Sequence, residues 1–217
     1  MAWDFSNRIA SALSLKIATC LLLFINVYIP LQQSSVMTDD LWVNLENYID
    51  HFTQLYPDAS IIVTGYCNAR FNVTFPVPIL HPNLNHRQFK DCGRNYAALC
   101  LMYMITNSGS SLLNRCITGD RPGEFTFTCL AGASTVDYVL ISRDLLDRIH
   151  DFKVVYHAES DHLPLVLKIY FNNYNVFADL VFITPIAATT IGARIVVRRI
   201  GCIYETAAVF RALFIFQ

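Results

Sequence analysis

Short apolar segments typical of β-strands alternate with helical segments along most of this chain. Residues 20–28 form a continuous run rich in Leu, Phe, Ile and Val, which is typical of a strand buried on both faces. Residues 38–55 carry apolar side chains at spacings of three and four, which predicts an amphipathic helix ended by Pro57. Further strands are expected at residues 12–18, 60–64, 125–129, 136–141, 153–156 and 164–170, and further helices at residues 96–106 and 143–150. Strands that alternate with helices, interrupted by direct strand-to-strand steps, indicate an α/β fold with mixed sheets.

The composition narrows the possible functions without fixing one. The 217 residues suffice for one sizeable core. Lys and Arg number 16 against 17 Asp and Glu, so the overall charge does not indicate nucleic acid, although local patches decide such binding. The run at residues 20–29 resembles a signal peptide or a short membrane anchor. It is shorter than the ~20 residues that a spanning helix needs and ends at Pro30, so a buried strand fits better and no membrane attachment is expected.

The cysteines favour an intracellular protein. There are seven, an odd number, and no two have the C-x-x-C spacing. Neither a disulfide framework nor a cysteine zinc site is therefore suggested. Free thiols persist in a reducing compartment, which favours a nuclear or cytoplasmic location.

Polar residues lie at the ends of several predicted strands. In α/β folds such strand ends gather into binding and catalytic sites. A histidine beside a carboxylate can have its tautomer and orientation fixed, as acid–base and phosphoryl chemistry both require. Each signal is weak alone, since a Ser-Asp-His string is more often part of a loop than of a site. Their order and spacing together predict a site made of Tyr28, Asn68, Asp137, Asp161 and His162.

Five strings occur in one order along the chain: residues 26–30 (NVYIP), 61–70 (IIVTGYCNAR), 125–127 (FTF), 134–142 (STVDYVLIS) and 160–164 (SDHLP). Together they resemble the endonuclease/exonuclease/phosphatase superfamily, which is also called DNase I-like. The nearest resemblance is to the endonuclease domain of non-LTR (LINE-type) retrotransposons, whose turn normally reads Gly-Asp-Phe-Asn-Ala-Arg. The resemblance extends over residues 12–170, from which we expect a partial family domain at residues 12–171, flanked by a non-family start (1–11) and a non-family hydrophobic tail (172–217).

The resemblance implies a four-layer α/β sandwich of two packed mixed sheets that cuts phosphodiester bonds with a divalent metal, usually Mg²⁺. Retrotransposon members nick DNA, so DNA is the implied partner. Tyr28 would contact the scissile phosphate, and Asn68 would hold the phosphate or the attacking water. Asp161 would help to bind metal or position water, His162 would stabilise the phosphate oxygens or transfer a proton, and Asp137 would orient His162. We therefore expect these residues to converge, with Asp137 about 2.6–3.2 Å from a ring nitrogen of His162.

Two departures from the family pattern count against activity. Tyr66 stands where the family turn has Asp. The family's opening segment, with its Asn and its principal metal-binding Glu, has no counterpart before Ala12, so the first strands are expected to be missing. Because Mg²⁺ requires oxygen ligands in near-ideal geometry, we expect its binding and hence cleavage to fail. The expected function is that of a truncated, inactive retrotransposon endonuclease; the alternative is a non-catalytic nucleic-acid or protein-binding remnant of the same fold.

The tail and the basic residues leave two further questions open. Residues 176–186 and 209–216 are apolar runs that match nothing in the family pattern. Read-through of flanking or rearranged sequence is the favoured interpretation, and an extra strand pair covering an exposed sheet edge is the alternative. A phosphate-binding face needs clustered cations, and the candidates are scattered along the sequence: Arg70, Arg87, Lys90, Arg94, Arg115 and Arg121.

Overall fold

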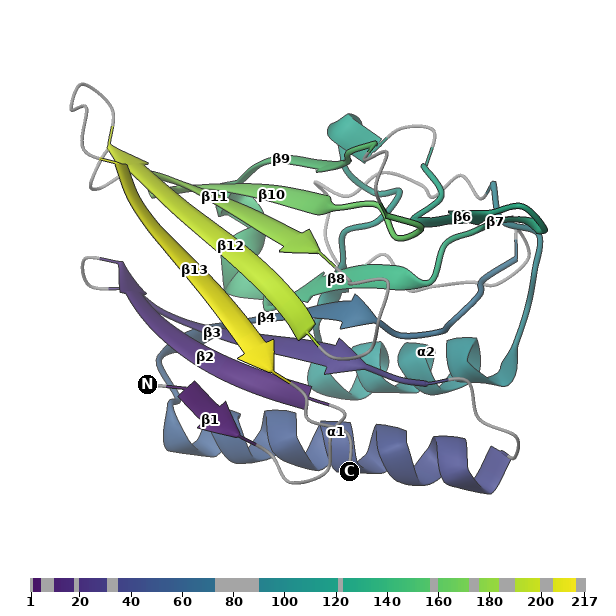
Figure 1. Cartoon of the computed structure of the whole chain (residues 1–217). Coiled ribbons are helices and arrows are strands. Elements are labelled where there is room, and N and C mark those ends of the chain that lie inside the picture. The colour runs from purple at the N-terminus through teal and green to yellow at the C-terminus, as the bar shows by residue number, and fades with distance from the viewer. Residues whose placement is uncertain are drawn as a thin grey trace.

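Two β-sheets packed face to face form the body of the protein in a computed structural model (Figure 1). The structure describes residues 2–4, 10–17, 20–30, 35–72, 90–120, 123–156, 160–171, 176–183, 190–199 and 205–213. The first sheet contains, in spatial order, β1 (Ala2–Asp4), β2 (Ala10–Ile17), β3 (Cys20–Tyr28), β4 (Ala59–Tyr66), β8 (Asp137–Ile141) and β5 (Ser111–Leu112). The second contains β13 (Glu205–Leu213), β12 (Thr190–Arg199), β11 (Val176–Ile183), β10 (Leu165–Phe171) and β9 (Ile149–Val154).

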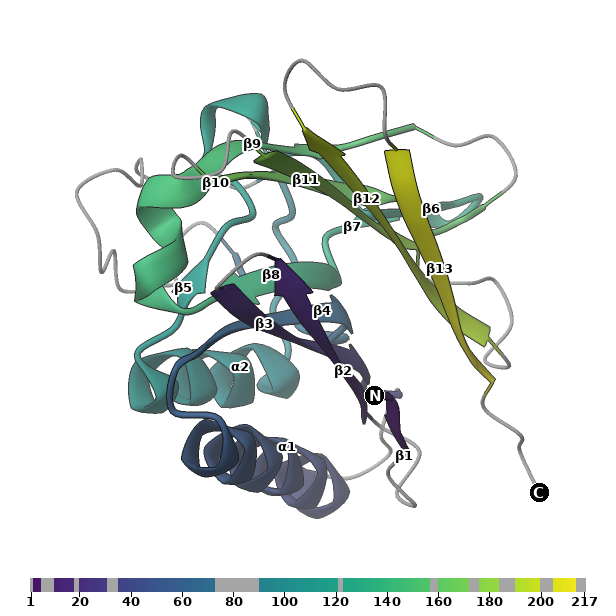
Figure 2. The ribbon, with the colours of Figure 1, turned by 90° about the vertical axis from the view of Figure 1, so that its left-hand side faces the viewer.

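Two helices cover the outer face of the first sheet (Figure 2). Helix α1 (Ser35–Leu55) connects β3 to β4, and this crossover makes the two strands parallel. It begins three residues before the expected Thr38. Helix α2 (Tyr96–Ser108) begins at the cap residue Asn95, whose side chain accepts a hydrogen bond from the Ala98 amide, and ends at Gly109 in the left-handed conformation. Both predicted helices are therefore confirmed, with small shifts at their ends.

Strand β3 is buried on both faces, as its composition predicts. Leu23 and Ile25 point into the cluster formed with the helices, whereas Leu22 and Phe24 point into the cluster between the sheets. Alternation of side chains along a strand explains this division. The apolar run is thus explained by its place between two cores. In the part of the chain that the structure describes, no helix is both long enough and apolar enough to cross a membrane.

The second sheet differs from the expected architecture in the direction of its strands. Mixed pairing occurs in the first sheet, but every described strand pair of the second sheet is antiparallel. Its strands follow one another along the chain without helical crossovers, and such connections favour antiparallel pairs. The helix expected at residues 143–150 is a shorter 3₁₀ helix, η2 (Arg143–Arg148), because β9 already begins at Ile149.

The tail adds three strands to the second sheet. Residues 176–182 of β11 pair with the whole of β10, and β12 and β13 continue the sheet beyond β11. Leu180 and Phe182 of β11 are buried in the core between the sheets. The chain thus uses β11 to cover apolar side chains of the first sheet. The assignment of residues 172–217 to a non-family tail stays a prediction.

Candidate functional site

The ends of β3 and β4 lie side by side and place two tyrosines next to each other. Tyr28 and Tyr66 are paired residues in the parallel register, and their ring centroids are 5.3 Å apart. This close approach requires Gly65, whose φ is +127°. A Cβ at this position would lie 2.1 Å from the backbone oxygen of Val27, so any other residue would push the two strands apart.

The side chains of Asp137 and His162 pair at the end of the sheet where Tyr66 lies. Asp137 begins β8 opposite Tyr66, and His162 forms an isolated bridge with Phe127. His162 Nδ1 lies 2.9 Å from Oδ2 and 3.0 Å from Oδ1 of Asp137, so the expected contact is confirmed. The Asp137 side chain is 1% exposed and that of His162 is 14% exposed. An Nδ1–H that donates to this carboxylate fixes the tautomer and leaves Nε2 as the acceptor of the neutral ring.

A buried hydroxyl positions the Asp137 backbone. Thr126 Oγ1 accepts hydrogen bonds from the amides of Val136 and Asp137, both at 3.0 Å. The Thr126 carbonyl accepts from the Leu163 amide at 2.7 Å, next to His162. Thr126 therefore connects the strand that carries Asp137 with the loop that carries His162. The pairing of the two side chains follows from this backbone arrangement.

Tyr66 occupies the centre of an aromatic cluster. Its ring meets the His162 ring edge-on at 5.2 Å, and the ring of Phe127 lies 4.8 Å from His162 on centroids. Burial, followed by the nearby Asp137 carboxylate, raises the pKa of Tyr66 to about 12. The side chain is accordingly a neutral phenol at physiological pH.

Asn68 sits in a strained turn that the start of α2 stabilises. Its φ is +49°, in the left-handed region that asparagine tolerates better than most residues. The Asn95 side chain donates to the Asn68 carbonyl and accepts from the Arg70 amide at 2.9 Å. Asn95 also caps α2, so one amide fixes both the turn and the helix relative to each other.

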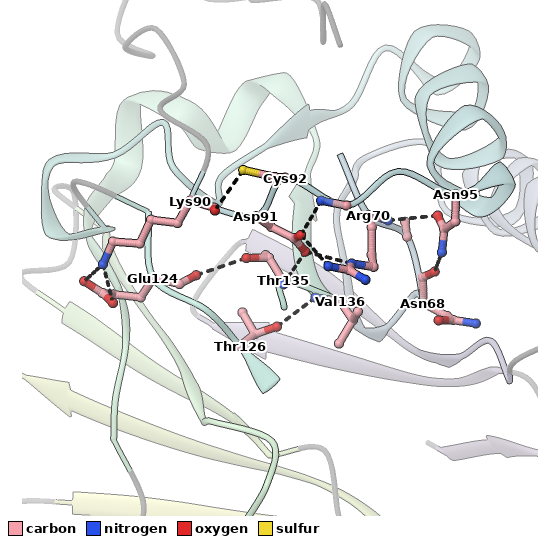
Figure 3. A network of polar contacts seen from close by, with 12 residues as sticks. Asn68, Arg70, Lys90, Asp91, Cys92, Asn95, Glu124, Thr126, Thr135 and Val136 are labelled. Carbon is pink, nitrogen blue, oxygen red and sulfur yellow. Dashed lines mark hydrogen bonds and ion pairs between the residues drawn. The ribbon is translucent and has the colours of Figure 1, made fainter. Parts of the chain in front are cut away.

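A buried carboxylate links this turn to the strand that carries Asp137 (Figure 3). Asp91 accepts from Arg70 Nε at 3.1 Å and Nη2 at 2.7 Å, and from the amides of Gly93 at 2.7 Å and Thr135 at 3.0 Å. Burial alone would raise the pKa of Asp91, but these hydrogen bonds together hold it below its ordinary value. The site thus rests on a bidentate ion pair, a geometry that adds specificity as well as energy.

A cavity of about 330 Å³ opens beside Tyr66. Its walls come from β4, the turn after β4, the start of α2 and the hairpin of β6 (Phe127–Cys129) and β7 (Gly132–Ser134). The hairpin occupies the place of the strand expected at residues 125–129. Two rings, two guanidinium groups and two amides dominate the lining: Tyr66, Phe127, Arg70, Arg94, Asn68 and Asn95. None of the described residues that line it is acidic.

Comparisons with known proteins identify the architecture. No protein-family model matches the sequence, and no curated protein sequence matches it. The structure is similar to the endonuclease domain of TRAS1, a telomere-specific non-LTR retrotransposon, with a TM-score of 0.54 and 17% sequence identity over 79% of this chain and 69% of that chain. The protein has a DNase I-like α/β fold. It is also similar to the 3′-5′ exonuclease NExo from Neisseria meningitidis, with a TM-score of 0.50 and 13% identity over 77% of this chain and 67% of that chain.

The DNase I-like fold brings most of the expected residues together. The Tyr66 ring contacts both Tyr28 and His162, Asp137 pairs with His162, and Asn68 shares the cavity with Tyr66. Asp161 lies next to His162 but is exposed, and its carbonyl accepts from the Thr128 amide at 2.8 Å. Four of the five residues therefore lie near Tyr66, and the assignment of all five as site residues stays a prediction.

The described residues do not fit a Mg²⁺ site. Both oxygens of the Asp137 carboxylate lie within hydrogen-bond distance of His162 Nδ1. Across the described ranges, no three His, Cys, Asp or Glu side chains are grouped so that they could hold a metal ion. Mg²⁺ is usually held by one or two carboxylates together with waters and substrate phosphates. Here the Asp137 carboxylate is paired with His162, and Asp161 is exposed.

Several residues of this site were not singled out from the sequence as site residues. Asn95 precedes an apolar helix and matches an N-cap pattern, so it could have been found. Phe127 lies in the string at residues 125–127, but no site role was assigned to it from the sequence. Asp91 carries no local signal, because its contacts are with segments far away in the sequence. Of the scattered basic residues, Arg70 and Arg94 meet at the cavity; Arg87 and Arg121 lie outside the described residues.

Proposed function

We propose that this protein derives from a retrotransposon-type endonuclease and retains its phosphodiester site without metal-dependent cleavage. The observation that carries the proposal is the position of Tyr66. A neutral phenol lies between Tyr28 and His162, where the related nuclease pattern has a carboxylate. The similarity to the TRAS1 endonuclease domain supports the origin of the fold, and the Asp137–His162 pair supports a retained site.

The physical reason for inactivity is the set of available ligands. In phosphoryl transfer, metal ions and positioning supply most of the rate acceleration. A phenol whose pKa is about 12 is a poor metal ligand at neutral pH, because it must lose its proton to bind as an anion. The Asp137 carboxylate already accepts a hydrogen bond from the imidazole of His162, and Asp161, the other carboxylate next to His162, is exposed to solvent. Cleavage should therefore be many orders of magnitude slower than in a metal-competent relative.

A plasmid-nicking assay tests the proposal. Purified protein is incubated with supercoiled plasmid in Mg²⁺, Mn²⁺ or EDTA, beside His162→Ala and a mock purification. We expect the same background nicking in every sample. We also expect none from Tyr66→Asp, because one restored carboxylate does not complete a ligand set. Metal-dependent nicking that disappears in His162→Ala would overturn the proposal.

The second candidate is a binding module of the same fold, which acts on nucleic acid or protein without chemistry. The cavity beside Tyr66 favours nucleic acid over protein. Its lining combines aromatic rings with Arg70 and Arg94, and guanidinium groups recognise phosphate in bidentate geometry. This candidate is compatible with the first, since an inactive nuclease site can still bind.

A further inference from the structure

The cavity beside Tyr66 has two aromatic walls that come from different elements. Tyr66 ends β4, and Phe127 begins β6 in the hairpin. Both rings contact the His162 ring, at 5.2 Å and 4.8 Å between centroids. Rings that are held by neighbours lose little freedom when a ligand stacks on them. A nucleobase of any sequence can stack on such rings, because every base has a π-face.

The charge of the cavity suits a phosphate. The side chain of Arg70 is 40% exposed, and its ion pair with Asp91 uses Nε and Nη2 among five N–H donors. Arg94 is exposed and lies on the same wall. The Asp91 carboxylate offsets much of the charge of Arg70, so the exposed Arg94 supplies the further cation on this wall, and the lining itself includes no carboxylate among the described residues.

Tyr66 changes what the site needs in order to bind phosphate. A carboxylate at this position would repel a phosphate unless a cation lay between them. The phenol carries no charge at neutral pH, and it adds a stacking surface. The substitution that counts against catalysis therefore favours binding without a metal.

The size and position of the cavity favour a single unpaired nucleotide. Its volume of about 330 Å³ lies near the lower end of the range for small-ligand pockets, roughly 300–1,000 Å³. In a duplex, the faces of each base are covered by its neighbours, so a base must leave the stack to reach Tyr66 and Phe127. A single strand does not have to break base pairs to expose a base.

From these observations we propose that the cavity binds one unpaired nucleotide of a nucleic-acid strand without a divalent metal. The base lies against Tyr66 and Phe127, and the phosphate is held by Arg70 and Arg94. This inference rests on the proposed retention of a phosphodiester site, and it adds the ligand class and the independence from metal.

Fluorescence anisotropy in EDTA tests the inference. The probes are a fluorescein-labelled single strand of about 15 nucleotides, within the range that single-strand-binding folds cover, and the duplex of the same strand. We expect the single strand to bind about tenfold tighter than the duplex, because pairing hides the base. Adding Mg²⁺ should not tighten either complex. Equal or tighter binding of the duplex, or binding that requires the metal, would overturn the inference.

Two variants test the stacking wall. Tyr66→Leu and Phe127→Leu should each weaken single-strand binding about tenfold, in line with the loss of one base–aromatic stack. Tyr103→Leu is the matched control, because Tyr103 is an exposed tyrosine on α2 outside the cavity. Thermal unfolding establishes that each variant is folded. Unchanged affinity in folded Tyr66→Leu and Phe127→Leu would contradict the assignment.

The phosphate contact is tested separately, with a substitution at an exposed residue outside the hydrophobic core. Arg94→Gln removes an exposed cation and should reduce the slope of log K against log salt concentration by about 0.7, the value for one phosphate on a single strand. The control is Arg143→Gln, since Arg143 contacts Gly109 at the opposite end of α2. An unchanged slope in Arg94→Gln refutes the phosphate assignment.

A competition experiment separates a strand from a free nucleotide. Deoxyadenosine monophosphate should compete only weakly, since a strand gains further backbone contacts. Competition at concentrations similar to those of the strand would overturn the assignment to a strand and assign the cavity to free nucleotides. Metal-dependent nicking would refute the proposed inactivity alone, whereas absent single-strand binding without nicking would refute this inference alone.

Discussion

Removing the Asp91 carboxylate should destabilise the fold and loosen both sides of the candidate site. The side chain is 1% exposed and accepts four hydrogen bonds, two from Arg70 and one each from the amides of Gly93 and Thr135. The substitution Asp91→Ala leaves all four donors without this acceptor. Because Thr135 lies two residues before Asp137, we expect the substitution also to disturb the contact between Asp137 and His162.

The size of the destabilisation depends on which of the four donors remain buried without an acceptor. Breaking a fully buried ion pair costs about 3–5 kcal/mol, and a hydrogen bond to a charged group contributes about 1.5–3 kcal/mol. The Arg70 side chain is 40% exposed, so water replaces part of what it loses. The buried Thr135 amide has no such replacement. We therefore expect Asp91→Ala to lower the free energy of unfolding by about 2–4 kcal/mol.

Urea unfolding followed by circular dichroism measures this change, and Glu124→Ala is the matched control. Glu124 also pairs with a basic side chain, Lys90 at 2.9 Å, but both partners are exposed. An exposed pair contributes about 0–1 kcal/mol. If Asp91→Ala and Glu124→Ala destabilise the protein by the same amount within about 0.5 kcal/mol, the reasoning about the buried network is wrong.

The pH dependence gives a second check. Folding lowers the pKa of Asp91 below its ordinary value of 3.8. The carboxylate therefore stabilises the fold fully at pH values above that ordinary pKa, and the stabilisation is lost as the pH falls through the lower pKa of the folded state. The difference in stability between the wild-type protein and Asp91→Ala should consequently shrink below about pH 4.

Three further outcomes are expected. Gly65→Ala should lower the free energy of unfolding in urea by about 2 kcal/mol or more, because its Cβ would collide with the Val27 backbone. Gly109→Ala is the control and should cost less, since its Cβ would meet no atom within 4 Å. Equal costs would exclude the close approach to Val27 as the cause. Leu180→Ala should cost about 2–5 kcal/mol, because this side chain is fully buried between the sheets; a cost near zero would show that the tail is not part of the fold. Tyr66→Phe should reduce the loss of stability at high pH. The pKa of Tyr66 is raised to about 12, so its stabilising effect is present below the ordinary value of 10.0 and disappears as the pH rises towards 12; stability curves from pH 9 to 12 that coincide would refute this.

The order of elements could be predicted from the sequence because its signals are local. Continuous apolar character identified β3, and spacings of three and four identified α1. Tyr28 could be assigned to the end of a strand, and Asn68 to the turn after the next strand, for the same reason. Boundaries were less certain: η2 and β9 divide a segment that was expected to be one helix, since residues 149–154 gain their conformation from pairing with β10.

The contacts that make the site could not be predicted from local pattern alone. His162 and Asp137 meet because Thr126 connects their backbones, and Asp91 joins Arg70 to Thr135, which lies 44 residues after Asp91 in the sequence. The resemblance suggested the first contact, but nothing in the sequence suggested the second. Likewise, no pattern in residues 176–183 decided between an unpaired tail and a strand of the second sheet.

By itself, the sequence indicated many of the strands, both long helices and the order of the motifs, and its resemblance to the family suggested that Tyr66 stands in place of a turn carboxylate. The tertiary structure alone decided that Tyr66 lies between Tyr28 and His162, that Arg70 and Arg94 share a cavity with Phe127, and that β11 completes the core. The physical reason is the range of the interactions. Side-chain periodicity and backbone propensity act over a few residues, whereas burial and hydrogen bonding between distant segments depend on how the two sheets pack.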